Sequence, residues 1–255
     1  CVRSSDGRFQ AWASYNPSSR IAARVLSFDE SVYPDEAWLR TCLSRAIEAR
    51  GPVPSGEARR LVNAEADGLP GVVIDLYGDV AVLQLSTAGA DQLKDAIVEW
   101  LRTRPACAGI YEKSDADSRE LEGLRPREGW IQQPKNSDVQ IVEHGLRYRV
   151  DFIGGQKTGF YLDQRDSRAR IRALAQGCEM LNCFSYTGAF AIAAVAGGAC
   201  SVLSIDSSAA ALEAARENAR LNGLDGAKLD WVEADVFKEL RRLRDLGRRF
   251  DCIVL

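Results

Sequence analysis

The sequence predicts an α/β protein whose C-terminal part is a parallel sheet with helices on both faces. Two observations carry this prediction. Apolar runs with the length of buried strands recur, at 178–184, 200–206, 229–235 and 250–255. Amphipathic or small-residue helical segments alternate with them, at 161–175, 187–198, 208–223 and 236–247. Regular alternation of helix and strand indicates a parallel sheet, because each parallel connection needs a crossover element.

The N-terminal part has a different rhythm. Residues 1–33 are rich in strand patterns, with a turn at Asn16-Pro17-Ser18. An amphipathic helix over 34–50 and a Gly/Pro-rich stretch then form a linker, 34–57. Residues 58–153 predict a small α+β domain, with a hairpin around Gly78-Asp79, a helix over 90–104 and strands within 108–114 and 139–152. The parallel-sheet domain would occupy 154–255.

Composition excludes several classes of protein. The 255 residues are 46% hydrophobic and 27% charged, and no apolar run approaches the roughly 18 residues that span a bilayer. We therefore expect a cytoplasmic protein with no membrane association. The chain begins with Cys1 instead of Met and stops in an apolar run, so we expect it to be a piece of a longer protein, truncated at both ends.

Metal chemistry is not expected. The seven cysteines are scattered without CxxC spacing, and His144 is the only histidine. Zinc sites need clustered Cys and His ligands, so we predict no metal and no Cys-His catalytic pair away from His144. The net charge of −3 does not indicate nucleic-acid binding, although arginines cluster at 165–172 and 241–249.

Polar residues stand where three successive strands of the predicted sheet end. Asn182 and the loop 183–188 follow the first strand, Asp206 ends the second, and Asp235 ends the third. Ligands of parallel sheets bind at the carboxyl ends of the strands. A glycine-containing loop followed by an acid at the next strand end is typical of an adenosine cofactor, whose ribose hydroxyls donate to the acid.

The glycine content of the loop favours S-adenosylmethionine over a dinucleotide. The G-x-G-x-x-G fingerprint is absent, since only Gly188 is present. Several glycines let the backbone approach a pyrophosphate, whereas S-adenosylmethionine carries no phosphate. A nicotinamide oxidoreductase and a parallel-sheet domain without a cofactor remain alternatives.

Several segments resemble one known family. They are "GGQKTGFYLDQRDSR" (154–168), "LNCFSYTGAFAIAA" (181–194), "SIDSSAAALEAARENARLNGL" (204–224), "NAEADGLPGVVIDLYGD" (63–79) and "YEKSDADSRELEGL" (111–124). Together they closely resemble the RlmI-type bacterial 23S ribosomal RNA methyltransferases, which make 5-methylcytosine. Residues 1–33 resemble the C-terminal part of that family's PUA domain, a small RNA-binding barrel. The resemblance covers essentially the whole chain and implies a Rossmann-like class I methyltransferase domain behind the central α+β domain.

The resemblance implies a role for each motif. The loop that holds the methionine end of the cofactor would contain Asn182, Phe184, Ser185, Tyr186, Thr187 and Gly188. Asp206 would bind the ribose with Ser207 beside it, and Asp235 would contact the adenine. A segment that caps the cofactor would include Lys157, Thr158, Phe160, Asp163, Gln164 and Arg165. Asp115, Arg119 and Glu122 match family positions, and we expect them to form scaffolding salt bridges.

No catalytic residue is expected within this chain. Cytosine-C5 methylation needs a thiolate, and in the family that cysteine follows an Asp-Pro-Pro motif, which would begin just after Leu255. Cys183 is expected to face the cofactor or the core and to take no part in the reaction.

Ribosomal RNA is the expected partner, with Arg20 and Arg24 as candidate phosphate contacts. A homodimer is one option for assembly. Guanine-N7 methylation, as in a related branch, and a non-catalytic RNA-binding protein are the alternatives.

Overall fold

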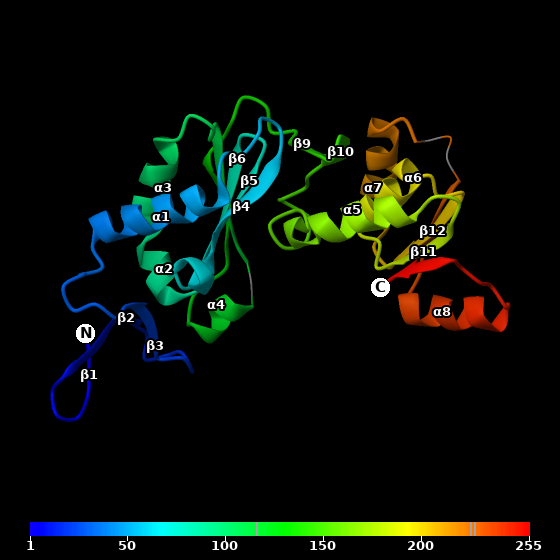
Figure 1. Cartoon of the computed structure of the whole chain (residues 1–255). Coiled ribbons are helices and arrows are strands. Elements are labelled where there is room, and N and C mark those ends of the chain that lie inside the picture. Colours follow the sequence, from blue (N-terminus) through cyan, green and yellow to red (C-terminus); the bar gives the residue numbers. More distant parts are fainter. Residues whose placement is uncertain (116, 225, 227) are drawn as a thin grey trace. The chain divides into compact units, whose positions relative to one another are not determined.

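The computed structural model describes residues 1–115, 117–224, 226 and 228–255, and these form two compact units (Figure 1). The first unit contains Cys1–Val139 and Asp151–Phe160, and the second contains Gln140–Val150 and Tyr161–Leu255. The chain therefore passes between the units three times. This division differs from the segments drawn on the sequence, because residues 140–150 pack with the parallel sheet and residues 151–160 with the first unit.

The N-terminal strands form a small antiparallel sheet. Its strands, in the order β1-β2-β3, are β1 (Val2–Arg3), β2 (Phe9–Tyr15) and β3 (Ala23–Ser27). The turn between β2 and β3 is built on Asn16, whose side-chain oxygen accepts from the Ser18 amide at 3.0 Å. This Asx turn confirms the turn predicted there, and it uses the side-chain acceptor that makes Asn common in turns.

A five-stranded sheet is the centre of the first unit. Its order is β4-β5-β6-β7-β8, from β4 (Ala58–Asn63), β5 (Val72–Tyr77), β6 (Val80–Leu85), β7 (Gly109–Ser114) and β8 (Arg127–Gln132). Only β6 and β7 are parallel neighbours. The predicted hairpin at Gly78-Asp79 is confirmed as β5 and β6, whereas β8 was not predicted.

Helices of this unit pack on the sheet. The helical segments are α1 (Glu36–Arg50), the 3-10 turn η1 (Ala64–Asp67), α2 (Ala88–Gln92), α3 (Lys94–Arg102) and α4 (Ser118–Leu121), of which α1, α2 and α3 contribute to the buried core of the sheet. Asp35 caps α1 by accepting from the Trp38 amide at 2.9 Å. The single helix predicted over 90–104 is instead two helices that meet at Leu93. Leu43 of α1 and Ile97 of α3 lie in one buried core with Ile74 and Leu83 of the sheet.

The second unit contains the predicted parallel sheet. Its strands are β11 (Glu179–Cys183), β12 (Ser201–Asp206), β13 (Leu229–Glu233) and β14 (Cys252–Val254). They lie in the order β13-β12-β11-β14, and every pair is parallel. The carboxyl ends of β11, β12 and β13 therefore meet at one edge, as the alternation of elements predicted.

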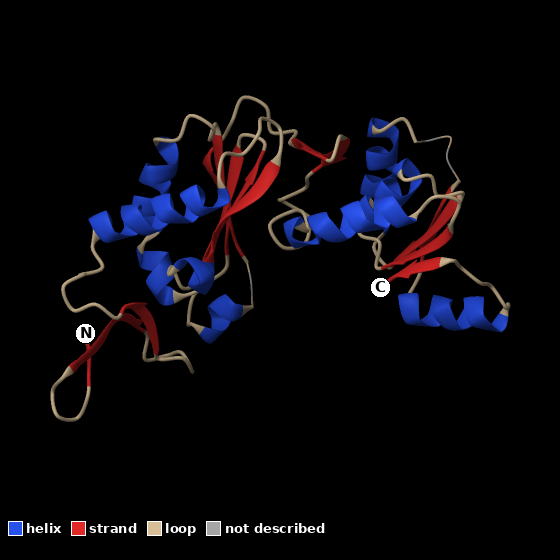
Figure 2. Ribbon diagram, viewed as in Figure 1, coloured by secondary structure: helices blue, strands red, loops and turns tan. Residues whose placement is uncertain are grey.

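Helices pack on both faces of this sheet (Figure 2). They are α5 (Arg165–Leu174, preceded by the 3-10 turn η2, Leu162–Gln164), α6 (Ala189–Ala196), α7 (Ala209–Leu221) and α8 (Val236–Asp245). Met180 and Val202 pack with Ala191 and Ala194 of α6 on one face. Leu181 and Ile205 pack with Val236 and Leu243 of α8 on the other. Adjacent residues of a strand point to opposite faces, so both faces of β11 and β12 are apolar.

A hairpin that precedes residues 154–168 in the chain completes the second unit. Its strands are β9 (Gln140–Glu143) and β10 (Leu146–Arg149). Asn218 of α7 accepts from the Arg149 amide at 2.8 Å, and Asn222 accepts from the Arg147 amide at 2.8 Å. These side-chain bonds satisfy the free edge of β10. None of the helices in the described part of the chain has both the length and the apolar character needed to cross a membrane.

Candidate functional site

The loop after β11 carries unusual backbone angles. Phe184 and Tyr186 have φ values of 54° and 47°, in the left-handed region that non-glycine residues rarely adopt. The Ser185 amide donates to the Ile205 carbonyl at 3.0 Å, which ties the loop to the end of β12. Left-handed residues cost on the order of 1–3 kcal/mol each and cluster at ligand sites. The loop is therefore a binding-site candidate by its backbone alone.

Gly188 closes this loop where no side chain fits. Its φ is 76°, and a Cβ atom there would lie 2.8 Å from both the Ala215 Cβ and the Trp231 ring. Helix α6 begins at the next residue, Ala189. The unpaired amides of the first helical turn therefore begin directly after the loop, at the edge where the strands end.

Asp206 organises the loop from the end of β12. One carboxylate oxygen accepts from the Tyr186 amide at 2.8 Å and the other from the Ser208 amide at 2.9 Å. A carboxylate offers about four acceptor sites, so two remain for further donors. This capacity matches the two hydroxyls of a ribose. Ser207 beside it is exposed.

Asp235 lies at the neighbouring strand end. Its carboxylate accepts from the Lys238 amide at 2.8 Å and so caps α8, while the residue remains exposed. The Ala234 amide donates to the Asp206 carbonyl at 3.0 Å, which brings the ends of β12 and β13 together. The structure thus places the two predicted acids at adjacent strand ends on one edge of the sheet.

The loop also contains polar groups that lack partners. Ser185 Oγ and Thr187 Oγ1 are buried and have no hydrogen-bond partner among the described residues. Asn182 is 2% exposed, and its side-chain amide donates to Ser204 Oγ at the long distance of 3.5 Å. Leaving a buried hydroxyl unpaired costs about 1–3 kcal/mol. These groups fit a site where a polar ligand supplies the missing partners.

Phe184 turns outward from the same loop. It is 52% exposed and meets the ring of Phe237 on α8 edge-on, with centroids 5.7 Å apart. An exposed aromatic pair beside two carboxylates provides an apolar surface for a planar ring.

Residues 154–168 form the signature segment, and its second half lies against this loop. The Tyr161 ring meets the Tyr186 ring at 5.5 Å and 74°. Burial raises the pKa of the Tyr161 hydroxyl, and the nearby carboxylates of Asp163 and Asp206 raise it further. Asp163 is exposed, while Gln164 and Arg165 are half-buried at the start of α5. The three predicted residues Asp163, Gln164 and Arg165 therefore belong, with Tyr161, to the unit that contains the loop.

The first half of the segment belongs to the other unit. The Thr158 hydroxyl donates to Asp75 at 2.5 Å and shares a 2.8 Å hydrogen bond with the Tyr77 hydroxyl. Tyr77 also donates to the carbonyl of Phe160, a residue that is itself 2% exposed. Lys157 is exposed with a φ of 52°. Thr158 and Phe160 are thus anchored on β5 of the first unit.

Cys183 is a core residue. Its thiol is buried with Leu181, Ile205 and Val236 on the α8 face, and burial raises its pKa. A raised pKa lowers the thiolate fraction, which is the opposite of what a nucleophile needs. Cys178 and Cys200 stand just before β11 and β12, at the far ends of those strands from the loop.

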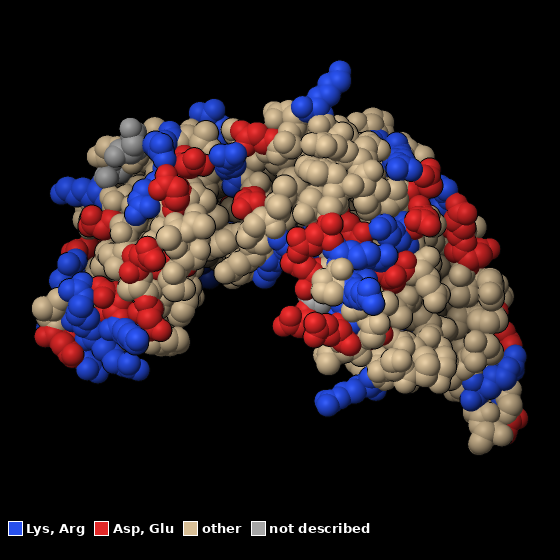
Figure 3. All heavy atoms as spheres, turned by 180° about the vertical axis from the view of Figure 1, so that it is seen from behind, with Lys and Arg blue, Asp and Glu red and all other residues tan. Residues whose placement is uncertain are grey.

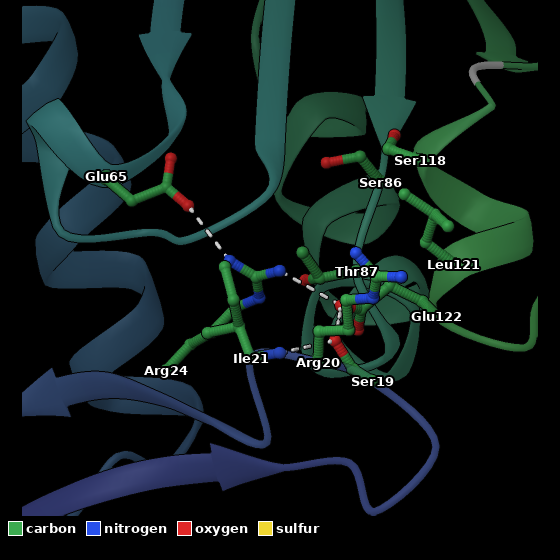
Figure 4. Close-up of a pocket in the computed structure, with 10 residues that line it drawn as sticks. All are labelled: Ser19, Arg20, Ile21, Arg24, Glu65, Ser86, Thr87, Ser118, Leu121 and Glu122. Carbon is green, nitrogen blue, oxygen red and sulfur yellow. Dashed lines mark hydrogen bonds and ion pairs between the residues drawn. The ribbon is translucent and has the colours of Figure 1, made fainter.

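The two candidate phosphate contacts differ in their surroundings (Figure 4). Arg24 lies between Glu122, at 2.9 Å, and Glu65, at 3.8 Å. Arg20 is exposed and lines the same cavity of about 460 Å³. Arg24 is therefore neutralised by the protein itself, and Arg20 is the better placed of the two to meet a phosphate.

Most charges of the basic clusters are also paired. Arg242 contacts Glu239 at 2.6 Å, and Arg248 contacts Glu179 at 2.6 Å. Basic and acidic side chains are interspersed over the face seen in Figure 3.

Arg119, 2% exposed, pairs with Asp91 at 3.0 Å, as expected for scaffolding. Within the described ranges, no group of three or more Cys, His, Asp or Glu side chains is placed to hold a metal ion.

Two buried residues near the site were not predicted. Glu143, at the end of β9, forms a bidentate pair with Arg168 of α5. Arg168 lies within the arginine cluster 165–172 noted in the sequence, but it is 2% exposed and faces the protein interior. The only signal for this pair in the sequence was Glu143 itself, the single acidic residue of the strand "QIVE", which precedes Arg168 by 25 positions.

Comparison with known proteins agrees with this geometry. The curated "Ribosomal RNA large subunit methyltransferase I" of Shewanella denitrificans is 44% identical over 255 residues; the match covers 98% of this chain and 64% of that protein. This chain thus spans less than two thirds of the length of that relative. A solved structure from Streptococcus mutans, described as a SAM-dependent methyltransferase, has a TM-score of 0.86 and 28% identity, over 99% of this chain and 66% of that one.

A further solved structure, of a methyltransferase complexed with SAH, shows the same TM-score, identity and coverage. The family model of S-adenosylmethionine-dependent methyltransferases matches residues 89–255, well over half of the chain. The strand-end acids and the single-glycine loop agree with the cofactor of that family. This chain therefore belongs to the S-adenosylmethionine-dependent methyltransferases.

Proposed function

We propose that this chain is the cofactor-binding part of a ribosomal RNA methyltransferase that makes 5-methylcytosine in 23S ribosomal RNA. The observation that carries the proposal is the loop 183–188 held by Asp206, combined with the 44% identity to a protein named for ribosomal RNA methylation. Residues 1–33 would be the C-terminal part of a PUA-like RNA-binding domain, with Arg20 as a phosphate contact.

The cofactor, when bound, supplies a methyl group on a sulfonium. Asp206 would accept from the ribose hydroxyls, with Ser207 beside it, and Asp235 would accept from the adenine amino group. The hydroxyls of Ser185 and Thr187 would gain their missing partners from the methionine end. Asn182, Phe184, Tyr186 and Gly188 would shape the loop around it.

The signature segment would close the pocket. Asp163, Gln164 and Arg165 continue from Tyr161, which touches the loop at Tyr186. Lys157, Thr158 and Phe160 precede them in the chain and belong to the first unit, so their role at the cofactor stays a prediction.

The cytosine reaction needs a thiol that this site does not supply. A thiolate would add to C6 of the base, and C5 would then attack the methyl group, whose bond to the cofactor's sulfur would break to leave a neutral thioether. A base removes the C5 proton, and the thiolate leaves as the double bond forms again. The target base must first leave its stack. The buried Cys183 thiol is unsuited to this step, so we propose that the nucleophile lies outside residues 1–255.

Product analysis tests the proposal. The full-length protein is incubated with unmodified 23S ribosomal RNA and S-adenosylmethionine, and the digested RNA is examined by mass spectrometry. We expect 5-methylcytidine. The appearance of 7-methylguanosine would assign the protein to the guanine-N7 branch, and RNA binding without either product would support a non-catalytic role.

Two substitutions separate cofactor binding from nucleophilic attack. Asp206→Ala removes the ribose acceptor and a bond to the loop, so the Kd for S-adenosylmethionine should rise by at least about tenfold. Cys183→Ala should leave methyl transfer largely unchanged. Lost activity with a normal Kd in Cys183→Ala would instead make Cys183 the nucleophile. The homodimer and the cytoplasmic location stay predictions, and light scattering of the purified protein tests the first.

A further inference from the structure

The buried ion pair of Glu143 and Arg168 contacts Tyr161, which in turn contacts the candidate loop at Tyr186. Arg168 Nε donates to Glu143 Oε1 at 2.6 Å, and its Nη2 donates to Oε2 at 2.8 Å. The side chains are 3% and 2% exposed, respectively. A bidentate pair of this kind fixes the plane of the guanidinium as well as its position.

The remaining side of Arg168 faces the signature segment. Its Nη1 donates to the Tyr161 carbonyl at 2.9 Å. The guanidinium also lies 6.0 Å from the centre of the Phe190 ring on α6, the helix that follows the loop. Arg168 is therefore held by β9 while it holds the backbone at Tyr161.

Tyr161 passes this constraint to the loop. Its ring meets Tyr186 edge-on, and the Tyr186 amide donates to Asp206. Tyr186 is one of the two loop residues with a strained left-handed φ. A strained residue keeps its conformation only where its surroundings determine it strongly. The Tyr161 ring is one of those surroundings.

We propose that Glu143 and Arg168 are positioning residues of the cofactor site, which act through Tyr161 on the conformation of Tyr186. The inference rests on the proposed function only in that the loop binds the cofactor. Apolar residues of similar volume often stabilise a fold as well as a buried ion pair does. A bidentate ion pair has an advantage over apolar residues where it must hold a neighbouring group in one orientation. Here that group is the Tyr161 carbonyl.

A double-mutant cycle tests the pathway. Arg168→Lys keeps the charge but loses the fork that contacts both Glu143 and Tyr161. Tyr161→Leu removes the ring and leaves the ion pair intact. Each change should raise the Kd for S-adenosylmethionine, measured by calorimetry, by on the order of tenfold. Because both act on Tyr186, the double variant should bind little worse than either single variant.

Two control variants complete the experiment. Tyr161→Phe keeps the ring and should raise the Kd much less than Tyr161→Leu does. Arg216→Lys alters an exposed pair with Glu213 on α7 and should bind normally. Circular dichroism identifies any variant that does not fold; if Arg168→Lys fails, Tyr161→Leu against Tyr161→Phe carries the test alone.

The outcomes distinguish this inference from the proposed function. An unchanged Kd in folded Tyr161→Leu, or fully additive losses in the double variant, would overturn the positioning role. Such results would leave the RNA product of the unmodified protein as it was. Failure of the unmodified protein to bind S-adenosylmethionine would overturn both proposals, and a different methylated nucleotide would overturn only the proposed function.

Discussion

The neighbouring stretches 151–160 and 161–168, which belong to different units, are held by different kinds of electrostatic interaction. In residues 151–160, the buried ammonium of Lys113 donates to three carbonyls, those of Phe152, Ile153 and Gly155, at 2.9, 3.0 and 2.7 Å. In residues 161–168, Arg168 is held by a carboxylate, that of Glu143. The first is a single charge surrounded by dipoles. The second is a carboxylate paired with the Arg168 guanidinium and, at 3.4 Å, with Arg165.

Lys113 and the Glu143–Arg168 pair differ in how many segments they hold and in what their loss leaves behind. All three protons of the Lys113 ammonium are used by one loop, so the loop is fixed at three points by one side chain. The Glu143–Arg168 pair instead joins β9, α5 and Tyr161, the residue before η2. Loss of one partner leaves a buried charge there, whereas loss of Lys113 leaves only unpaired dipoles. Four changes put this comparison to the test, in order of expected effect.

The largest effect is expected from Glu143→Ala. It strands the Arg168 guanidinium in a buried site and should lower the free energy of unfolding of the second unit by about 3–5 kcal/mol. Urea denaturation measures the change. The double variant Glu143→Leu with Arg168→Met should recover most of the loss, because both charges are gone. A double variant as unstable as the single one would show that the stranded charge is not the cause.

The second-largest effect is expected from acid, which should destabilise the first unit. Burial alone would raise the pKa of Glu122, but hydrogen bonds from Ser19, Arg24 and Asn16 lower it to about 2. Its ordinary value is 4.5, so its contribution is complete above pH 4.5 and is lost as the pH falls toward 2. The lost stability should be on the order of 2–3 kcal/mol.

Tryptophan fluorescence during urea unfolding at several pH values measures this loss, since four of the five tryptophans lie in the first unit. Glu122→Gln should flatten the dependence between pH 4.5 and 2. A profile that Glu122→Gln leaves as steep as before would assign the acid sensitivity to other carboxylates.

Lys113→Met should cost about 2 kcal/mol, less than Glu143→Ala. The methionine fills much of the same volume, but three carbonyls lose their donor. Hydrogen exchange should become faster in residues 152–155 and stay unchanged in 161–168. Equal acceleration in both stretches would mean that the two anchors form one cooperative structure.

The smallest effect is expected from Thr158→Val, at about 1 kcal/mol. The substitution keeps the shape and removes the hydroxyl shared with Asp75 and Tyr77. Thr158→Ser keeps the hydroxyl and serves as the matched control. Thermal denaturation of the two variants compares them, and a serine variant that loses more than the valine would assign the contribution to the methyl group.

The sequence predicted the parallel sheet and the edge where Asn182, Asp206 and Asp235 lie, because strand ends and turn residues are local signals. It did not predict the Glu143–Arg168 pair, because ion pairs between distant segments leave no periodic trace. Strand β8 was missed because "REGWIQ" lacks clear alternation, and its pairing with β7 decides its structure. The break at Leu93 was missed because helix propensity continues through it.

The burial of Cys183 has a practical consequence for labelling. Alkylating reagents react with exposed thiolates, and Cys1 and Cys200 are the exposed cysteines of the chain. In a Cys1→Ser protein, a maleimide fluorophore should attach first at Cys200, at the start of β12. Asp206 ends that same strand. The dye would therefore report on the second unit from the end of the sheet opposite the candidate loop, without touching it.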